Sequence, residues 1–79
     1  MADLFVRGEP GINFENWEPY YILTTEDGRT QTLPLQGIVA ISTKDGATTV
    51  YYQDGTQDIL HCLDSVALEF ENTWFNMGS

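Results

Sequence analysis

Short stretches rich in Thr, Tyr, Val and Ile alternate with polar turns through the middle of the chain. Three Asp-Gly pairs separate these stretches: Asp27-Gly28, Asp45-Gly46 and Asp54-Gly55. Asp-Gly supplies the two positive-φ positions of a type I′ turn and is the strongest short-range signal for a β-hairpin. The pattern therefore predicts an antiparallel β-meander.

The turns bound five predicted strands, which cover residues 20–25, 29–43, 47–53, 56–60 and 65–71. The second of these is too long for one flat strand, and Pro34 and Gly37 interrupt it. Proline cannot donate to the ladder, and glycine inside a strand often marks a bulge or a bend. We therefore expect residues 37–43 to leave the first sheet and enter a second.

The last predicted strand has the clearest alternation. Val66, Leu68 and Phe70 share one face, whereas Glu69 and Glu71 lie on the other. This pattern indicates a half-buried strand with an acidic outer face.

A chain of 79 residues is short enough to form one domain. We expect an irregular N-terminal segment over residues 1–19, antiparallel strands over residues 20–71 and a C-terminal tail over residues 72–79, with no helix longer than two turns. The predicted fold is all-β, or β-rich with at most a short helix. Its strands form an antiparallel meander that closes into a bent sheet or an SH3- or Sm-like barrel.

A domain of this size needs most of its large side chains in the core. The residues that we expect to be mainly buried are Phe5, Trp17, Tyr20, Ile22, Ile38, Ile41, Val50, Tyr52, Val66, Leu68 and Phe70. The aromatic residues that we expect to be exposed are Tyr21, Tyr51, Trp74 and Phe75.

The net charge of the chain limits the classes of partner that it is expected to bind. Twelve acidic side chains against three basic ones give a net charge of −9 at pH 7, in a chain that is still 42% hydrophobic and 13% aromatic. Such a composition can fold, unlike an acidic chain poor in aromatic residues. A negative field repels nucleic acid and anionic lipid and attracts basic protein surfaces. We therefore expect a basic protein partner, with no direct binding to nucleic acid or membranes.

The charge density permits mimicry of a nucleic acid without requiring it. A compact chain of this length spans about 30 Å, over which duplex DNA carries about 18 charges. The net charge of −9 is half of that value.

Two further features bear on location. The start of the chain, residues 1–7, lacks the basic and long apolar segments of a secretion signal. Its single cysteine excludes an intrachain disulfide. The expected location is the cytoplasm.

His61 and Cys62 are the candidates for nucleophilic catalysis. Neighbouring side chains on a strand point to opposite faces, so His61 is badly placed to activate Cys62. We expect Cys62 in the core and His61 at the surface. One Cys beside one His is also too few for a zinc site. We expect no catalytic residue, no metal ligand and no cofactor, and hence a protein that is not an enzyme.

The candidate partner-binding residues combine charge with aromatic area. The acidic candidates are Glu26, Asp27, Asp54, Asp58, Glu69 and Glu71, and the aromatic candidates are Tyr21, Tyr51 and Trp74. The first and third turns of a meander lie at one end, so the first four acidic residues are expected to cluster there. The last two form a stripe along the final strand. Interface centres are enriched in aromatic side chains, which would dock after electrostatic steering.

The leading hypothesis is a non-enzymatic acidic protein-binding module of the kind that phages encode as inhibitors. It would block a basic, nucleic-acid-binding surface of a host protein such as a defence or nucleic-acid enzyme. The alternative is a structural or assembly protein that forms homo-oligomers through its sheet edges, as in phage morphogenesis or ring-forming modules. A third option is a small-ligand binder. Solubility alone is the competing explanation of the charge.

Overall fold

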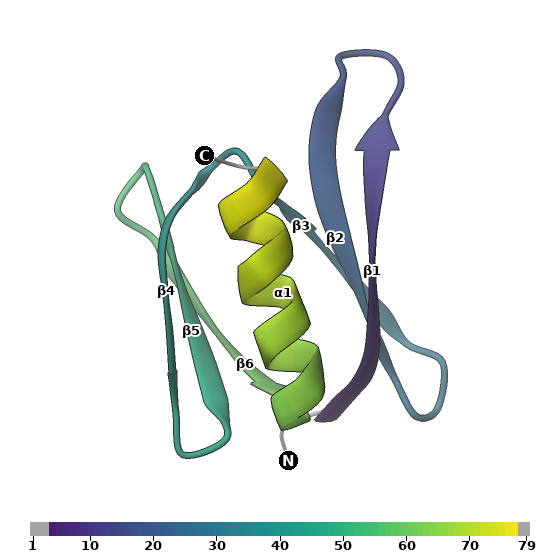
Figure 1. The fold of residues 1–79 in the computed structure, drawn as a ribbon, viewed down its shortest axis with the longest axis vertical. Coiled ribbons are helices and arrows are strands. Elements are labelled where there is room, and N and C mark those ends of the chain that lie inside the picture. The colour runs from purple at the N-terminus through teal and green to yellow at the C-terminus, as the bar shows by residue number, and fades with distance from the viewer. Residues whose placement is uncertain (1–3, 78–79) are drawn as a thin grey trace.

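The computed structural model describes residues 4–77, which form six β-strands followed by one α-helix (Figure 1). The elements are β1 (Leu4–Asn13), β2 (Glu18–Thr25), β3 (Thr30–Pro34), β4 (Ile38–Lys44), β5 (Ala47–Tyr52), β6 (Gln57–Cys62) and α1 (Asp64–Met77). The strands form one sheet in the order β3-β2-β1-β6-β5-β4.

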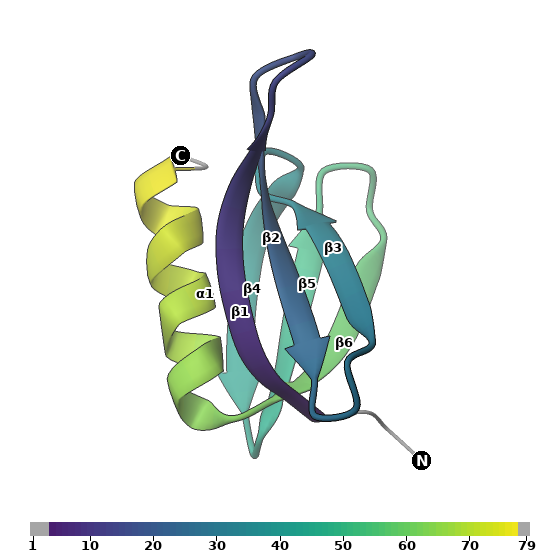
Figure 2. The ribbon, with the colours of Figure 1, turned by 90° about the vertical axis from the view of Figure 1, so that its right-hand side faces the viewer.

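The sheet consists of two antiparallel meanders joined at one corner. Strands β1, β2 and β3 form the first meander, and β4, β5 and β6 form the second. The join is a short parallel pairing of Leu4 with His61 and of Phe5 with Cys62. Beyond this corner β1 and β6 separate, so the sheet curls, and α1 packs across its concave side (Figures 1 and 2).

The prediction of a β-rich single domain is confirmed, whereas a closed barrel and an all-antiparallel meander are wrong. Strands β3 and β4 are the two edges of an open sheet, although only residues 35–37 connect them. Residues 37–43 therefore form the opposite edge of the same curled sheet instead of entering a second one. A single parallel pair, β1 with β6, makes the sheet mixed.

All three Asp-Gly pairs form turns between antiparallel strands, as predicted, but they do so in two ways. Asp45 and Gly46 both have positive φ, 54° and 80°, as a type I′ turn requires. In the other two turns only the glycine, Gly28 or Gly55, has positive φ. The Gly28 N–H donates to the carbonyl of Thr25 at 3.1 Å, which is the pattern of a longer hairpin loop with a glycine bulge.

The prediction of a final strand over residues 65–71 and a tail over residues 72–79 is wrong, and so is the expectation of no helix longer than two turns, because α1 has 14 residues. Residues 64–77 form α1, and the last two residues lie outside the described part of the chain. The buried positions are Val66, Ala67 and Phe70, with Trp74 half-buried behind them. This spacing of one, three and four residues is that of a helix. Leu68, which a strand would bury beside Val66, is 61% exposed.

The prediction of an irregular segment over residues 1–19 is also wrong over the described residues, because β1 occupies residues 4–13. Gly8, Pro10 and Gly11 hide the strand pattern. Both glycines serve packing: a Cβ on Gly8 would overlap the Tyr21 ring, and a Cβ on Gly11 would lie 2.5 Å from the Tyr20 ring. The backbone of β1 is therefore the surface on which these rings lie.

The core lies between α1 and the concave side of the sheet. Its buried residues are Phe5, Tyr21, Leu23, Leu33, Leu35, Ile38, Val50, Leu60, Cys62, Val66, Ala67 and Phe70. The Tyr21 ring meets the Phe70 ring at a centroid distance of 5.1 Å. Ile41, Tyr52 and Trp74 are partly buried against this cluster.

For three residues the predicted burial is the reverse of what the structure shows. Trp17 and Leu68 are exposed, and Tyr21 is buried. In β2 the inward positions are 21, 23 and 25, so Tyr20 and Ile22 on the other face are only half-buried. A shift of one residue in a strand exchanges its two faces, and this explains the reversal of Tyr20 and Tyr21.

Replacing Gly8 by alanine should lower the free energy of unfolding by about 1–3 kcal/mol, because the new methyl group displaces the buried Tyr21 ring. The matched control is Gly37→Ala. The nearest atom to a Cβ at Gly37 is Tyr52 Cδ1 at 3.8 Å, an ordinary contact, so the control should be close to wild type. Urea unfolding of the three chains measures both effects. Equal stability of the Gly8 and Gly37 variants would contradict the packing described for β1.

Candidate functional site

The acidic turns lie at opposite ends of the molecule, so the predicted cluster of Glu26, Asp27, Asp54 and Asp58 is wrong. Thr25, which precedes the first turn, and Cys62 both pair with Phe5. Asp27 therefore lies at the corner where β1 meets β6. The turn that contains Asp54 lies at the far end of β6 (Figure 1). A simple meander has no chain reversal at residues 35–37, and this extra reversal moves the third Asp-Gly turn to the other end.

The carboxylate of Asp27 is engaged within its own turn. It accepts a hydrogen bond from the Thr25 hydroxyl and forms an ion pair with Arg29 Nε at 3.1 Å. The Thr25 hydrogen bond, followed by that of Arg29, lowers the pKa of Asp27 below its ordinary value. These contacts show that Asp27 stabilises its own turn.

Glu69 and Glu71, which both lie in α1, do not form one stripe. Successive helix positions differ by about 100°, so Glu69 and Glu71 point about 200° apart. Glu69 lies over β1 and lines a hollow with Arg7, whereas Glu71 is half-buried. The predicted stripe is therefore wrong because the segment is a helix.

Of the three aromatic residues predicted to dock on a partner, only Tyr51 is exposed. Tyr21 is 1% exposed and cannot contact a partner. Trp74 is half-buried, and its Nε1–H donates to the Ile38 carbonyl at 3.1 Å, which ties α1 to edge strand β4. Tyr51 is exposed on β5, as predicted, and so is Phe75 on α1.

The most exposed aromatic pair lies at the tip of the β1–β2 hairpin, where the sequence argument placed no site. Phe14 is 77% exposed and Trp17 is 70% exposed. Their rings meet edge to face, with centroids 5.9 Å apart. Strand β3 pairs with β2 only as far as Tyr20, so the hairpin projects beyond the rest of the sheet (Figure 2).

Local hydrogen bonds define the shape of the tip. The Trp17 N–H donates to the Asn13 carbonyl at 2.7 Å. The side-chain oxygens of Asn13 and Asn16 accept hydrogen bonds from the backbone N–H groups of Glu15 and Glu18, at 3.0 and 3.2 Å. Asparagine favours such turns because its side chain can satisfy the backbone two residues later. This pair of asparagines is the signal that could have located the tip from the sequence.

Trp17 adopts a backbone conformation that bulky residues rarely occupy, with φ at 56°. Strained backbone of this kind costs about 1–3 kcal/mol and persists where the surroundings hold it. The Trp17 indole contacts the Phe14 ring and is exposed to solvent. Glu15 and Glu18 lie beside it, so the tip carries apolar area and negative charge together.

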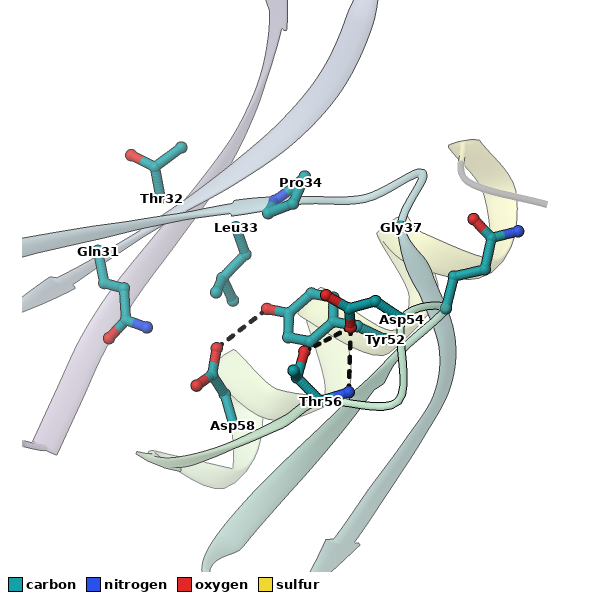
Figure 3. Close-up of a pocket in the computed structure, with 10 residues that line it drawn as sticks. Gln31, Thr32, Leu33, Pro34, Gly37, Tyr52, Asp54, Thr56 and Asp58 are labelled. Atoms are coloured by element: carbon teal, nitrogen blue, oxygen red, sulfur yellow. Dashed lines mark hydrogen bonds between the residues drawn. The ribbon is translucent and has the colours of Figure 1, made fainter.

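The second candidate site is a cleft of about 620 Å³ between β3 and the β5–β6 turn (Figure 3). Leu33 and Pro34 lie on the β3 side, and Tyr52, Asp54 and Asp58 lie on the other. The Tyr52 hydroxyl donates to Asp58 Oδ2 at 3.2 Å. Burial, and then the Asp58 carboxylate, raise the pKa of Tyr52 to about 12, so its hydroxyl stays protonated at neutral pH.

His61 and Cys62 lie on opposite faces of β6, as predicted. Cys62 is buried, and this burial raises the pKa of its thiol to about 11, whereas His61 is exposed. Among residues 4–77 no group of three or more His, Cys, Asp or Glu side chains is arranged to hold a metal ion. Within the same residues, α1 is neither long nor apolar enough to cross a membrane.

Comparison with models of protein families, with curated proteins and with solved structures finds no match for this chain.

Proposed function

We propose that this chain is a non-enzymatic, acidic protein-binding module that occludes a basic surface of a partner protein. The observation that carries the proposal is the Phe14–Trp17 pair, presented on a hydrogen-bonded tip that projects from the sheet. Aromatic side chains dominate binding energy at the centres of interfaces. Two exposed aromatic rings in contact, flanked by polar side chains, form an apolar patch of the kind that marks protein interaction sites.

Charge defines the class of partner. The net charge of −9 favours a basic surface, and Glu15 and Glu18 place two carboxylates beside the docking aromatics. A surface of a host protein that binds nucleic acid has the matching positive potential. The proposal is therefore a phage-type inhibitor that covers such a surface on a defence or nucleic-acid enzyme.

One observation favours the alternative, an assembly module that pairs through its sheet edges. Residues 28–44 contain no acidic side chain, and they include both edge strands, β3 and β4. Edge strands usually carry charges that prevent pairing with another chain. A chain as acidic as this one would meet a second copy most easily through that stretch. Light scattering distinguishes the two functions, because a stable dimer or ring favours assembly and a monomer favours the inhibitor.

The charge of the tip should govern the rate of association. The partner would be isolated from host lysate by affinity capture, and its binding kinetics measured with purified chains. The variant Glu15→Gln/Glu18→Gln removes two charges at the tip, and Glu26→Gln/Asp45→Asn removes two at the opposite end. We expect the tip variant to associate about 3- to 10-fold more slowly at low salt, with a shallower salt dependence, and the control to change much less.

Either of two results would overturn this proposal. One is an association rate that does not change between low and moderate salt. The other is an equal loss of rate in the tip variant and in the variant at the opposite end.

A further inference from the structure

The cleft between β3 and the β5–β6 turn has walls of different chemistry. Pro34, beside the buried Leu33, provides an apolar wall on β3, while Tyr52, Asp54 and Asp58 face it from the second meander (Figure 3). Its volume, about 620 Å³, is within the range of roughly 300–1,000 Å³ that small-molecule sites occupy. The cleft exists because β1 and β6 separate beyond their two-residue join, which leaves the two meanders unpaired here.

The residues that line the cleft favour a positively charged ligand. It contains two carboxylates, Asp54 and Asp58, and no Arg, Lys or His. Each carboxylate is positioned by a hydrogen bond to one of its oxygens: Asp58 Oδ2 accepts from Tyr52, and Asp54 Oδ1 accepts from the backbone N–H of Thr56 at 3.0 Å. Within residues 4–77 their other oxygens, Asp58 Oδ1 and Asp54 Oδ2, have no hydrogen bond and remain available as acceptors.

The shape of the cleft favours a planar cation. The Tyr52 hydroxyl points to Asp58, the Asp54 carboxylate lies beside Tyr52, and Pro34 lies on the opposite wall (Figure 3). A guanidinium group is flat, stacks on aromatic rings and carries five N–H donors in a fixed fork. It is also less strongly hydrated than an ammonium group, and its aliphatic stem can cover apolar surface. A metal ion is less well suited, because only two carboxylates line the cleft.

We infer that this cleft binds the guanidinium group of an arginine side chain on a partner protein. The group lies against the Tyr52 ring beside Pro34, and its N–H donors reach the available oxygens of Asp54 and Asp58. Pro34, on the β3 wall, pairs with Tyr20 of β2, so the cleft opens at the base of the projecting hairpin. The inference rests on the proposed function in one respect, since a basic partner on the tip supplies the arginine.

Chemical-shift titration of the ¹⁵N-labelled full chain tests the inference without the partner. The probe is N-acetyl-arginine-N-methylamide, and its neutral control is the citrulline analogue, which has nearly the same shape. We expect saturable shifts at Gln31, Tyr52 and Asp58 with millimolar affinity for the arginine probe, and at least tenfold weaker binding of the citrulline probe. The Asp58→Asn variant should weaken the arginine probe at least fivefold, whereas Asp45→Asn, at the opposite end, should leave it unchanged.

A further arm distinguishes the source of the cation. A short peptide with a central arginine should bind at least as tightly as methylguanidinium, a free cation that carries the same single charge. Tighter binding of methylguanidinium would overturn the assignment to a protein side chain. Equal shifts with arginine and citrulline, or an unchanged affinity in Asp58→Asn, would overturn the site itself. None of these titration results changes the outcome expected for the hairpin-tip variants. The proposed arginine site and the proposed function can therefore be refuted independently of each other.

Discussion

Replacing Phe70 by alanine is expected to lower the free energy of unfolding by about 3–5 kcal/mol, as for other buried phenylalanines. Phe70 is 0% exposed and its ring contacts that of Tyr21 on β2. Domains in general have only about 5–15 kcal/mol in total, and small ones bury a smaller share of their surface. A large fraction of the variant should therefore be unfolded at physiological temperature.

The same substitution tests the role of the helix. The two meanders share only a two-residue parallel join, and α1 packs on β1 of one meander and on β4 and β6 of the other. Loss of Phe70 should therefore also separate the meanders, which would appear as lost amide protection in both. The matched control is Phe75→Ala on the same helix, where the side chain is 67% exposed and the cost should be below about 1 kcal/mol. Equal losses in a urea titration would contradict the packing of α1.

Strands β2, β5 and β6 were predictable because the signals that define them are local in the sequence. Residues 20–25, 47–53 and 56–60 were predicted as strands, and β2, β5 and β6 occupy these positions with bounds shifted by up to two residues. The Asp-Gly pairs fix the turns through backbone chemistry, which a single sequence shows directly. What they could not show was the chain reversal at residues 35–37, where no such pair is present.

The helix and the first strand were missed for different reasons. In α1 the alternation of Val66, Leu68 and Phe70 coincides with a strand pattern, and only the burial of Ala67 and the position of Trp74 reveal the helical period. In β1 the glycines weaken the strand signal. They are explained by rings of the neighbouring strand, a long-range contact that the local pattern does not contain.

The candidate site depended on long-range structure almost entirely. Trp17 was assigned to the core because a small domain needs its large side chains inside. Its exposure follows from the length of the β1–β2 hairpin relative to β3, which no local pattern reports. The amino-acid composition alone predicts an acidic surface. It does not predict the separation of Asp27 from Asp54, because that separation depends on how the strands connect.

The aromatic tip should carry most of the binding energy for the partner. The variant Phe14→Ser/Trp17→Gly removes both rings, and truncation of such central aromatics typically costs 2 kcal/mol or more each, so we expect an affinity loss of about 100-fold or greater, mainly through faster dissociation. Glycine adopts the positive φ of position 17 without strain, which offsets the lost contact between the rings. The free energy of unfolding should therefore stay within about 1 kcal/mol of wild type.

The matched control for this variant is Leu68→Ser, which removes an apolar side chain from the helix that is 61% exposed. It should change the affinity by less than about threefold, as do most substitutions outside the energetic centre of an interface. The comparison thus separates docking by the tip from a general effect of surface hydrophobicity.

The most direct measurement is the dissociation constant of the captured partner for wild type, the tip variant and Leu68→Ser, at one salt concentration and with folding checked by urea titration. The predicted result is a tip variant that folds normally and binds at least 100-fold more weakly, beside a control near wild type. A tip variant that binds as well as wild type would show that the partner is held elsewhere on the molecule.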